Sequence, residues 1–194
     1  MCSSDLRINY HFESKANLAK LISLDFFNDF FDKIQYVLRN EHDMASPKME
    51  VICIDLFLKL LMENENCRRF FREICVARIF VQIWYDIVFR AFKEANKIYK
   101  CELSDDVLIS YATIYAQALD GLVVHLADDV KLRKPIDFYI DIFERLFMKM
   151  MDRPKEMQDH NVKVLESMAA KVGVEVNDFT HLKVWNIETC EMAE

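Results

Sequence analysis

The sequence predicts an all-α protein, and three observations lead to this prediction. The 194 residues include only two glycines and three prolines, well below the average usage of roughly 7% and 5%. Tight β-hairpins need glycine or proline turns, so a sheet-rich fold is disfavoured. Hydrophobic residues make up 53% of the chain, enough for a sizeable core, and they recur at helical spacing through most of its length.

The first long helix is predicted from about Lys15 to Leu38. Ser14 precedes it as an N-cap, because its hydroxyl can accept a hydrogen bond from a backbone N–H of the first turn. Before this cap, the segment from Ser4 to Tyr10 has the length of one short helix. The polar run from Asn40 to Pro47 separates the long helix from the next one.

Three helices are predicted in the middle of the chain. The helix from Pro47 to about Glu63 is apolar almost all round, so we expect it to be buried on several sides and central in the domain. The segment from Glu63 to Cys75 reads as a turn and a short helix. A long helix should then run from about Val76 to Tyr99.

The next helix is predicted from a cap at Ser104 to about Leu126. Asp105 and Asp106 lie in its first turn, where carboxylates complement the helix dipole. Gly121 lies in its interior, at a cost of about 1 kcal/mol relative to alanine. We therefore expect a second helix to approach the backbone closely at this glycine.

A further helix from Pro135 to about Met151 carries two apolar faces. The residues of the first face are Ile136, Tyr139, Ile140, Phe143, Phe147 and Met150. Those of the second are Phe138, Ile142 and Leu146. Two apolar faces imply two packing partners, and the second partner can be another subunit.

The C-terminal region begins after Pro154. Residues 155–172 are predicted to form one more helix, ended by Gly173 as the C′ residue. The last stretch has no helical period, and its apolar residues suggest a short strand or a packed arm: Val174, Val176, Val184 and Trp185. We expect this tail to fold back on its own subunit or on a partner.

The net charge, the cysteines and the hydropathy of the chain each disfavour some classes of protein. The net charge of −7 disfavours a broad basic surface for nucleic acid, although residues 1–20 carry a local net charge of +1 from three basic and two acidic side chains. None of the six cysteines forms a CxxC pair, and buried free thiols in a reducing compartment explain them.

No signal peptide is visible, and no uncharged apolar window reaches the roughly 18 residues of a membrane span. We expect a cytoplasmic protein that does not enter a membrane.

One stretch, INYHFESKANLAKLI from Ile8 to Ile22, resembles the end of the DNA-binding domain of the tetracycline-repressor (TetR) family. In that family an aromatic-Tyr-His-Phe run ends the recognition helix, and a Ser-Lys cap and a long helix follow. Here the run is Asn9-Tyr10-His11-Phe12, followed by Ser14-Lys15. Asn9 stands where an aromatic residue is usual, and Leu6 where a small residue is usual.

Three later segments resemble further TetR helices in the same order. Residues 46–71 resemble the fifth helix and the short helix after it, the helix from Val76 resembles the seventh, and Ala118–Leu126 resembles the Asp-Gly-Leu stretch of the eighth. The resemblance covers roughly Ser3 to Met151. It implies that the first helix and most of the second helix of the DNA-binding domain are missing.

The resemblance also implies a TetR-like helical bundle in three parts. Residues 1–38 would be the remnant of the DNA-binding domain, with its helix-turn-helix end, plus the connecting helix. Residues 39–151 would be the ligand-binding and dimerisation domain, and residues 152–194 a C-terminal extension. The implied phosphate contacts are Ser4, Tyr10 and Lys15, and the implied major-groove contacts are Arg7, Asn9 and His11. The alternative is that this segment only caps the long helix.

A small apolar or aromatic ligand is implied inside each subunit. Tyrosine and tryptophan can present a polar tip to a ligand in an apolar pocket. The candidate ligand residues are Phe57, Phe80, Trp84, Tyr111 and Tyr115, with Met62 and His125 as weaker candidates. The alternative for each of them is plain core filling.

The function that follows from these features is a TetR-like, ligand-responsive transcriptional regulator. It would be a homodimer through helices within residues 104–151, and it would bind operator DNA if the N-terminal helices are present. The alternative is a helical ligand-sensing or protein-interaction domain that does not bind DNA. We expect no enzyme, no cofactor and no metal site, because the five histidines are scattered and two glycines cannot build a phosphate-binding loop.

Overall fold

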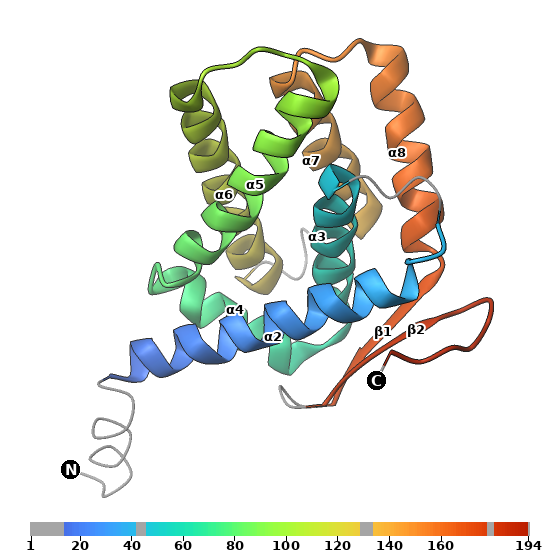
Figure 1. Ribbon diagram of the computed structural model, residues 1–194. Helices are drawn as coiled ribbons and strands as arrows, with labels where there is room; N and C mark the ends of the chain where they lie inside the picture. Colours follow the sequence, from blue (N-terminus) through green and yellow to red (C-terminus); the bar gives the residue numbers. More distant parts are fainter. Residues whose placement is uncertain (1–13, 42–45, 129–133, 178–180, 194) are drawn as a thin grey trace, which may run out of the picture.

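The computed structural model confirms the all-α class (Figure 1). The structure describes residues 14–41, 46–128, 134–177 and 181–193, without the side chains of residues 46 and 47. Within these ranges the helices are α2 (Lys15–Val37), α3 (Ser46–Glu63), α4 (Glu65–Val76), α5 (Phe80–Tyr99), α6 (Asp105–Asp128), α7 (Ile136–Met150) and α8 (Lys155–Ala169). Two short strands follow, β1 (Val172–Val176) and β2 (Leu182–Asn186).

Helix α3 lies at the centre of the bundle, as its all-round apolar sequence predicts. It contacts every other described helix and strand β1. Ile52, Phe57 and Leu58 on this helix are completely buried. Burial of several apolar side chains of this size is the dominant stabilising term for such a bundle.

Helix α2 begins where the sequence predicts. The Ser14 hydroxyl oxygen accepts a hydrogen bond from the backbone N–H of Asn17, at 3.0 Å. The buried side chains of α2 include Phe26, Phe27 and Phe30, which anchor this helix across one end of the bundle (Figure 1). The capped N-terminal end of α2 points away from the other helices, which leaves it accessible.

Helix α5 begins at Phe80, four residues later than the predicted start at Val76. The chain leaves α4 through Arg78, whose φ of 58° is left-handed, and the backbone N–H of Ile79 donates to Ile74 O at 3.0 Å. The predicted start is therefore wrong. Apolar residues continue through this turn, so hydrophobic spacing does not mark the break.

The predicted role of Gly173 at a helix end is also wrong. Helix α8 ends at Ala169, and Gly173 lies in β1, opposite Trp185 in the antiparallel register. A Cβ at Gly173 would lie 2.2 Å from Cε2 of Trp185. The glycine is needed because the indole ring covers its strand position.

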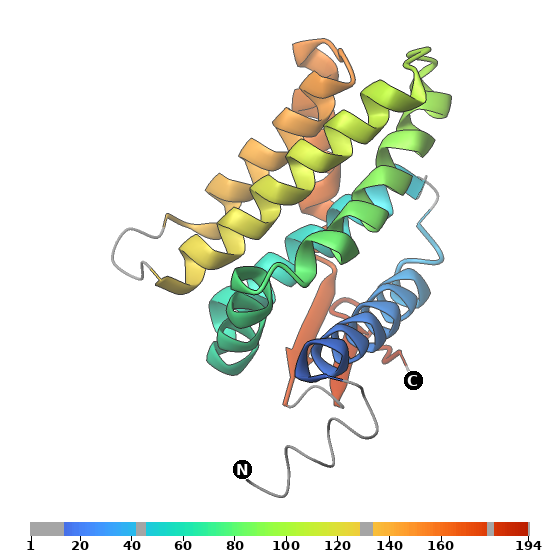
Figure 2. The same ribbon diagram turned by 90° about the vertical axis from the view of Figure 1, so that its left-hand side faces the viewer.

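The C-terminal hairpin packs on its own chain, beside α2 and α3 (Figures 1 and 2). The Lys33 ammonium of α2 donates to Leu182 O at 3.0 Å. The Asn64 side-chain amide, at the start of α4, donates to Val176 O at 2.8 Å. The prediction that the tail folds back is confirmed, and its target is the chain itself.

Helix α6 is long and apolar enough to pass a length-and-composition test for a membrane span, with 39% of its most apolar window buried in the structure. Asp120 lies inside this apolar stretch. Core helices of water-soluble proteins pass the same test. The expected close approach of a second helix at Gly121 is wrong within one chain, since no atom of another described helix lies within 4 Å of a Cβ built there.

Candidate ligand site and dimer face

The structure places one of the six residues with an implied DNA contact. Ser4, Arg7, Asn9, Tyr10 and His11 lie outside the described residues. Lys15 is exposed at the first helical position of α2, directly after the capping Ser14. Its contact with a DNA phosphate stays a prediction.

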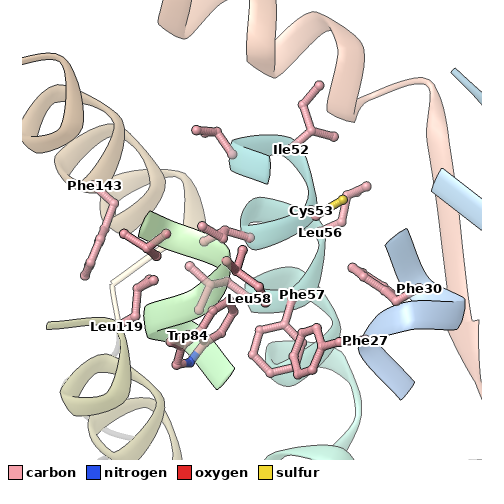
Figure 3. Close-up of a cluster of buried hydrophobic side chains, with 14 of the residues drawn as sticks. Phe27, Phe30, Ile52, Cys53, Leu56, Phe57, Leu58, Trp84, Leu119 and Phe143 are labelled. Carbon is pink, nitrogen blue, oxygen red and sulfur yellow. The ribbon is translucent and has the colours of Figure 1, made fainter. Parts of the chain in front are cut away.

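Three of the candidate ligand residues form one aromatic cluster. The ring centroids of Phe57 and Trp84 lie 5.4 Å apart, and those of Phe80 and Trp84 lie 5.0 Å apart. Phe27 of α2 and Phe71 of α4 complete the cluster, and Figure 3 shows Phe27, Phe57 and Trp84 facing one another. Such edge-to-face ring contacts are typical of a packed core.

Trp84 keeps one feature of a ligand residue. Its indole N–H is buried and has no hydrogen-bond acceptor among the described residues. A buried donor without a partner costs about 1–3 kcal/mol. A ligand or a water that accepts this hydrogen bond would recover that cost.

Tyr111 and Tyr115 belong to a second cluster, around Phe92 of α5. The Tyr115 hydroxyl is buried and donates to Phe143 O at 3.2 Å. His125 lies further along α6, with its Nε2 3.3 Å from the Tyr139 hydroxyl. Met62 is partly buried at the end of α3. The candidate residues thus occupy different parts of the core, and their contact with a ligand stays a prediction.

Two functional candidates were not predicted from the sequence, namely Asp55 of α3 and Glu144 of α7. Each is only 2% exposed. Burial raises the pKa of Glu144 to about 10, with a further contribution from the nearby Asp55 carboxyl. Burial also raises the pKa of Asp55, to about 7. The pair therefore retains at least one proton at neutral pH.

A sequence signal for these carboxyls exists in retrospect. Asp55 is an acidic residue between the buried Ile54 and Leu56 of α3, and Glu144 is four residues from both Ile140 and Met148, which are buried on α7. An acidic side chain on a buried face is rare unless it has a partner. Tyr115 lies near enough to both carboxyls for them to raise its pKa further, after the effect of burial.

A cavity borders Glu144 between the ends of α3 and α5 and the faces of α7 and α8. Its lining residues are Lys48, Val51, Tyr99, Glu144, Phe147, Met148, Asn161, Val162 and Leu165. The cavity has an empty volume of about 330 Å³, which includes the part open to solvent. The centre of a water molecule can occupy only about 20 Å³ of it, so the enclosed part is small. Both Glu144 oxygens are buried, and a hydrogen bond between the Glu144 and Asp55 carboxyls raises the pKa of Glu144 and lowers that of Asp55.

Helices α6 and α7 each expose two large apolar side chains, among polar ones such as Ser110, Thr113 and Gln117. The two helices run side by side on the face turned toward the viewer in Figure 2, and the Tyr115 and Phe143 rings join them at 5.3 Å. On α6, Ile109 is 42% and Ile114 is 57% exposed, and on α7 Phe138 is 49% and Ile142 is 44% exposed. On the second apolar face predicted for α7, the side chains of Phe138 and Ile142 are therefore about half exposed in the described part of the chain, and the Phe138 ring contacts that of Tyr139 at 5.4 Å.

Comparison of the chain with protein-family models, curated proteins and solved structures finds no match. Within the described ranges no cluster of three histidine, cysteine or acidic side chains could hold a metal ion. The function is therefore argued from the geometry and from the sequence pattern.

Proposed function

We propose that this chain is a subunit of a homodimeric, ligand-responsive transcriptional regulator of the TetR type. The observation that supports the proposal is the exposure of four large apolar side chains on the helix pair of α6 and α7, namely Ile109, Ile114, Phe138 and Ile142. Exposed apolar side chains on neighbouring helices can mark a protein–protein interface. A second copy is the natural occupant, because two such helix pairs form a four-helix bundle around a twofold axis.

The glycine of α6 supports the same arrangement. Gly121 is exposed, and a side chain built there would meet open space in the single chain. It lies seven residues after Ile114, and therefore on the same side of α6. A helix of a second subunit could approach closely at this position.

Helix α2 would connect ligand binding to DNA binding. It links the N-terminal segment that resembles a recognition helix to the aromatic cluster, through Phe27. A ligand that changes the packing around Trp84 would shift α2 through this contact. The spacing of the two N-terminal segments in a dimer would then change, which is a population shift between two states.

The test of the DNA-binding part is selection of duplexes by the full chain from a random pool. Enrichment of a palindromic site, with binding that weakens as salt rises, would support the proposal. The acidic net charge of −7 favours a second candidate, a helical sensing or interaction domain without DNA binding. A stable dimer that enriches no sequence would support that candidate.

A further inference from the structure

We propose that the free edge of strand β1 binds an extended peptide segment of a partner protein. The segment would add a strand to the C-terminal hairpin, in the groove between β1 and α3. This site is separate from the aromatic cluster around Trp84 and from the outer side of α6 and α7. The proposal holds whether or not the chain dimerises or binds DNA.

The first argument is the direction of the Val174 backbone groups. Val174 lies opposite Val184 in the antiparallel register, and Val184 O accepts a hydrogen bond from the backbone N–H of Ala193, at 2.9 Å. The Val184 carbonyl therefore points away from β1, so Val174 and Val184 are a pair that shares no ladder hydrogen bond. In such a pair the N–H and C=O of both residues point outward. Those of Val174 therefore point away from β2, toward the free edge of β1.

The second argument is that this edge lacks the usual protection. Among the described residues, the Asn64 amide caps Val176 O at 2.8 Å, but none is hydrogen-bonded to the N–H or C=O of Val174. Natural proteins protect sheet edges with proline, lysine or a bulge. The sequence VGVEV of β1 has no proline or lysine, and its register with β2 is regular. A strand of this kind is a template for a further strand.

The third argument is the groove beside the edge. It lies between β1, the C-terminal half of α3 and the end of α8, and its empty volume is about 750 Å³, including the part open to solvent. Binding pockets have volumes of roughly 300–1,000 Å³. Leu56 and Leu60 of α3 line one wall, and Trp185 and Ile187 line another. Successive side chains of an extended strand point to opposite faces, so a single added strand can use both walls.

The fourth argument is the charge of the α3 wall. Lys59 and Glu63 line the groove one helical turn apart. Glu63 directly precedes Asn64, whose amide reaches Val176 O, so Glu63 lies toward the Val176 end of β1 and Lys59 toward the other end. A complementary segment carries a basic residue near Glu63, an acidic residue near Lys59 and an apolar residue between them.

Selection of short peptides from a random library on the full chain tests the proposal. We expect the enriched peptides to lack proline and to carry an apolar residue between a basic and an acidic one. Methylation of their backbone nitrogens, one at a time, should weaken binding only at alternate residues, because every second N–H of an added strand faces β1. In the unmodified chain, the selected peptide should slow hydrogen exchange of the Val174 amide by about tenfold or more.

Two variants at one position separate the backbone donor from the side chain. Val174→Pro removes the N–H that faces the groove and leaves the hydrogen bonds between β1 and β2 in place. It should weaken binding of the selected peptide by about tenfold or more. Val174→Thr keeps the N–H, and it should change the affinity less than about twofold. Melting temperatures of both variants report whether the chain folds.

Four results would overturn the proposal. They are failure of the library to yield a binding peptide, equal binding by Val174→Pro, an effect of backbone methylation that does not alternate, and no change in Val174 exchange. Conversion of a dimer to monomers by Val174→Pro would also overturn it, because the edge would then pair with a second copy of the chain. The methylation and exchange measurements use the unmodified chain, so they decide the matter even if Val174→Pro does not fold.

Discussion

The carboxyl groups of Asp55 on α3 and Glu144 on α7 meet inside the helical core, and each side chain is 2% exposed. The two helices come from sequence positions 89 residues apart, and only the tertiary packing brings their acidic groups together. The pair makes the stability of the bundle depend on protons.

The first prediction concerns this pH dependence. Both pKa values are raised in the folded chain, to about 7 for Asp55 and about 10 for Glu144. The folded state therefore binds more protons than the unfolded state, whose carboxyls titrate near pH 4. From about pH 5 to about pH 10 the free energy of unfolding should fall as pH rises, by about 1.4 kcal/mol per unit for each proton that the folded pair still holds. Urea unfolding at several pH values measures this slope.

The variant Glu144→Gln should be more stable than the parent at about pH 8, and its slope should be smaller. Glu156→Gln, with the same charge change at an exposed position of α8, should keep the slope. An unchanged slope in Glu144→Gln would mean that this carboxyl does not hold its proton in the folded chain.

The second prediction concerns the aromatic cluster. Phe57 is completely buried, and its ring contacts those of Phe27, Phe71 and Trp84. Phe57→Ala should lower the free energy of unfolding by about 3–5 kcal/mol, because it leaves a cavity. Ile98→Ala, at a side chain of α5 that is 48% exposed, should cost far less. Thermal or urea unfolding at matched concentration makes the comparison, and equal costs would show that Phe57 is not in a packed core.

The third prediction concerns the C-terminal hairpin. Gly173→Ala should be destabilising by about 1–3 kcal/mol, since the new Cβ would lie within 2.6 Å of three ring atoms of Trp185. The same substitution in a Trp185→Ala background should be nearly neutral, because the ring is gone. A double-mutant cycle of melting temperatures measures this coupling. Additive effects would contradict the proposed contact.

Much of the fold was predictable because local signals carry it. Ser14 caps α2 as its sequence predicts, and the apolar sequence of α3 places that helix at the centre. The start of α5 was not predictable, because the turn at Arg78 lies inside an apolar run. Gly173 resembles a helix end in sequence, and its real role depends on Trp185, which contacts it only in the folded hairpin.

The candidate sites were predictable only in part. The sequence marks aromatic residues such as Trp84 and Tyr115 as core or ligand residues, but their assignment to two clusters depends on helix packing. Asp55 and Glu144 have no spacing relationship along the chain. Their interaction arises where α3 crosses α7, so no sequence pattern could predict it.

The fourth prediction concerns the outer face of α6 and α7. Ile114→Glu introduces a charge at the most exposed of the four isoleucine and phenylalanine positions on this face, and it should convert the dimer to monomers. Ile98→Glu changes a residue of α5 that is 48% exposed, and it should leave the dimer intact. Size-exclusion chromatography with light scattering distinguishes the two outcomes. A dimer in both variants would place the interface elsewhere.

The most direct test of the account is sedimentation equilibrium of the unmodified chain at micromolar concentration. The account predicts a species of twice the 23.1 kDa chain mass, formed through the exposed faces of α6 and α7. A species of 23.1 kDa alone, at every concentration in that range, would contradict it.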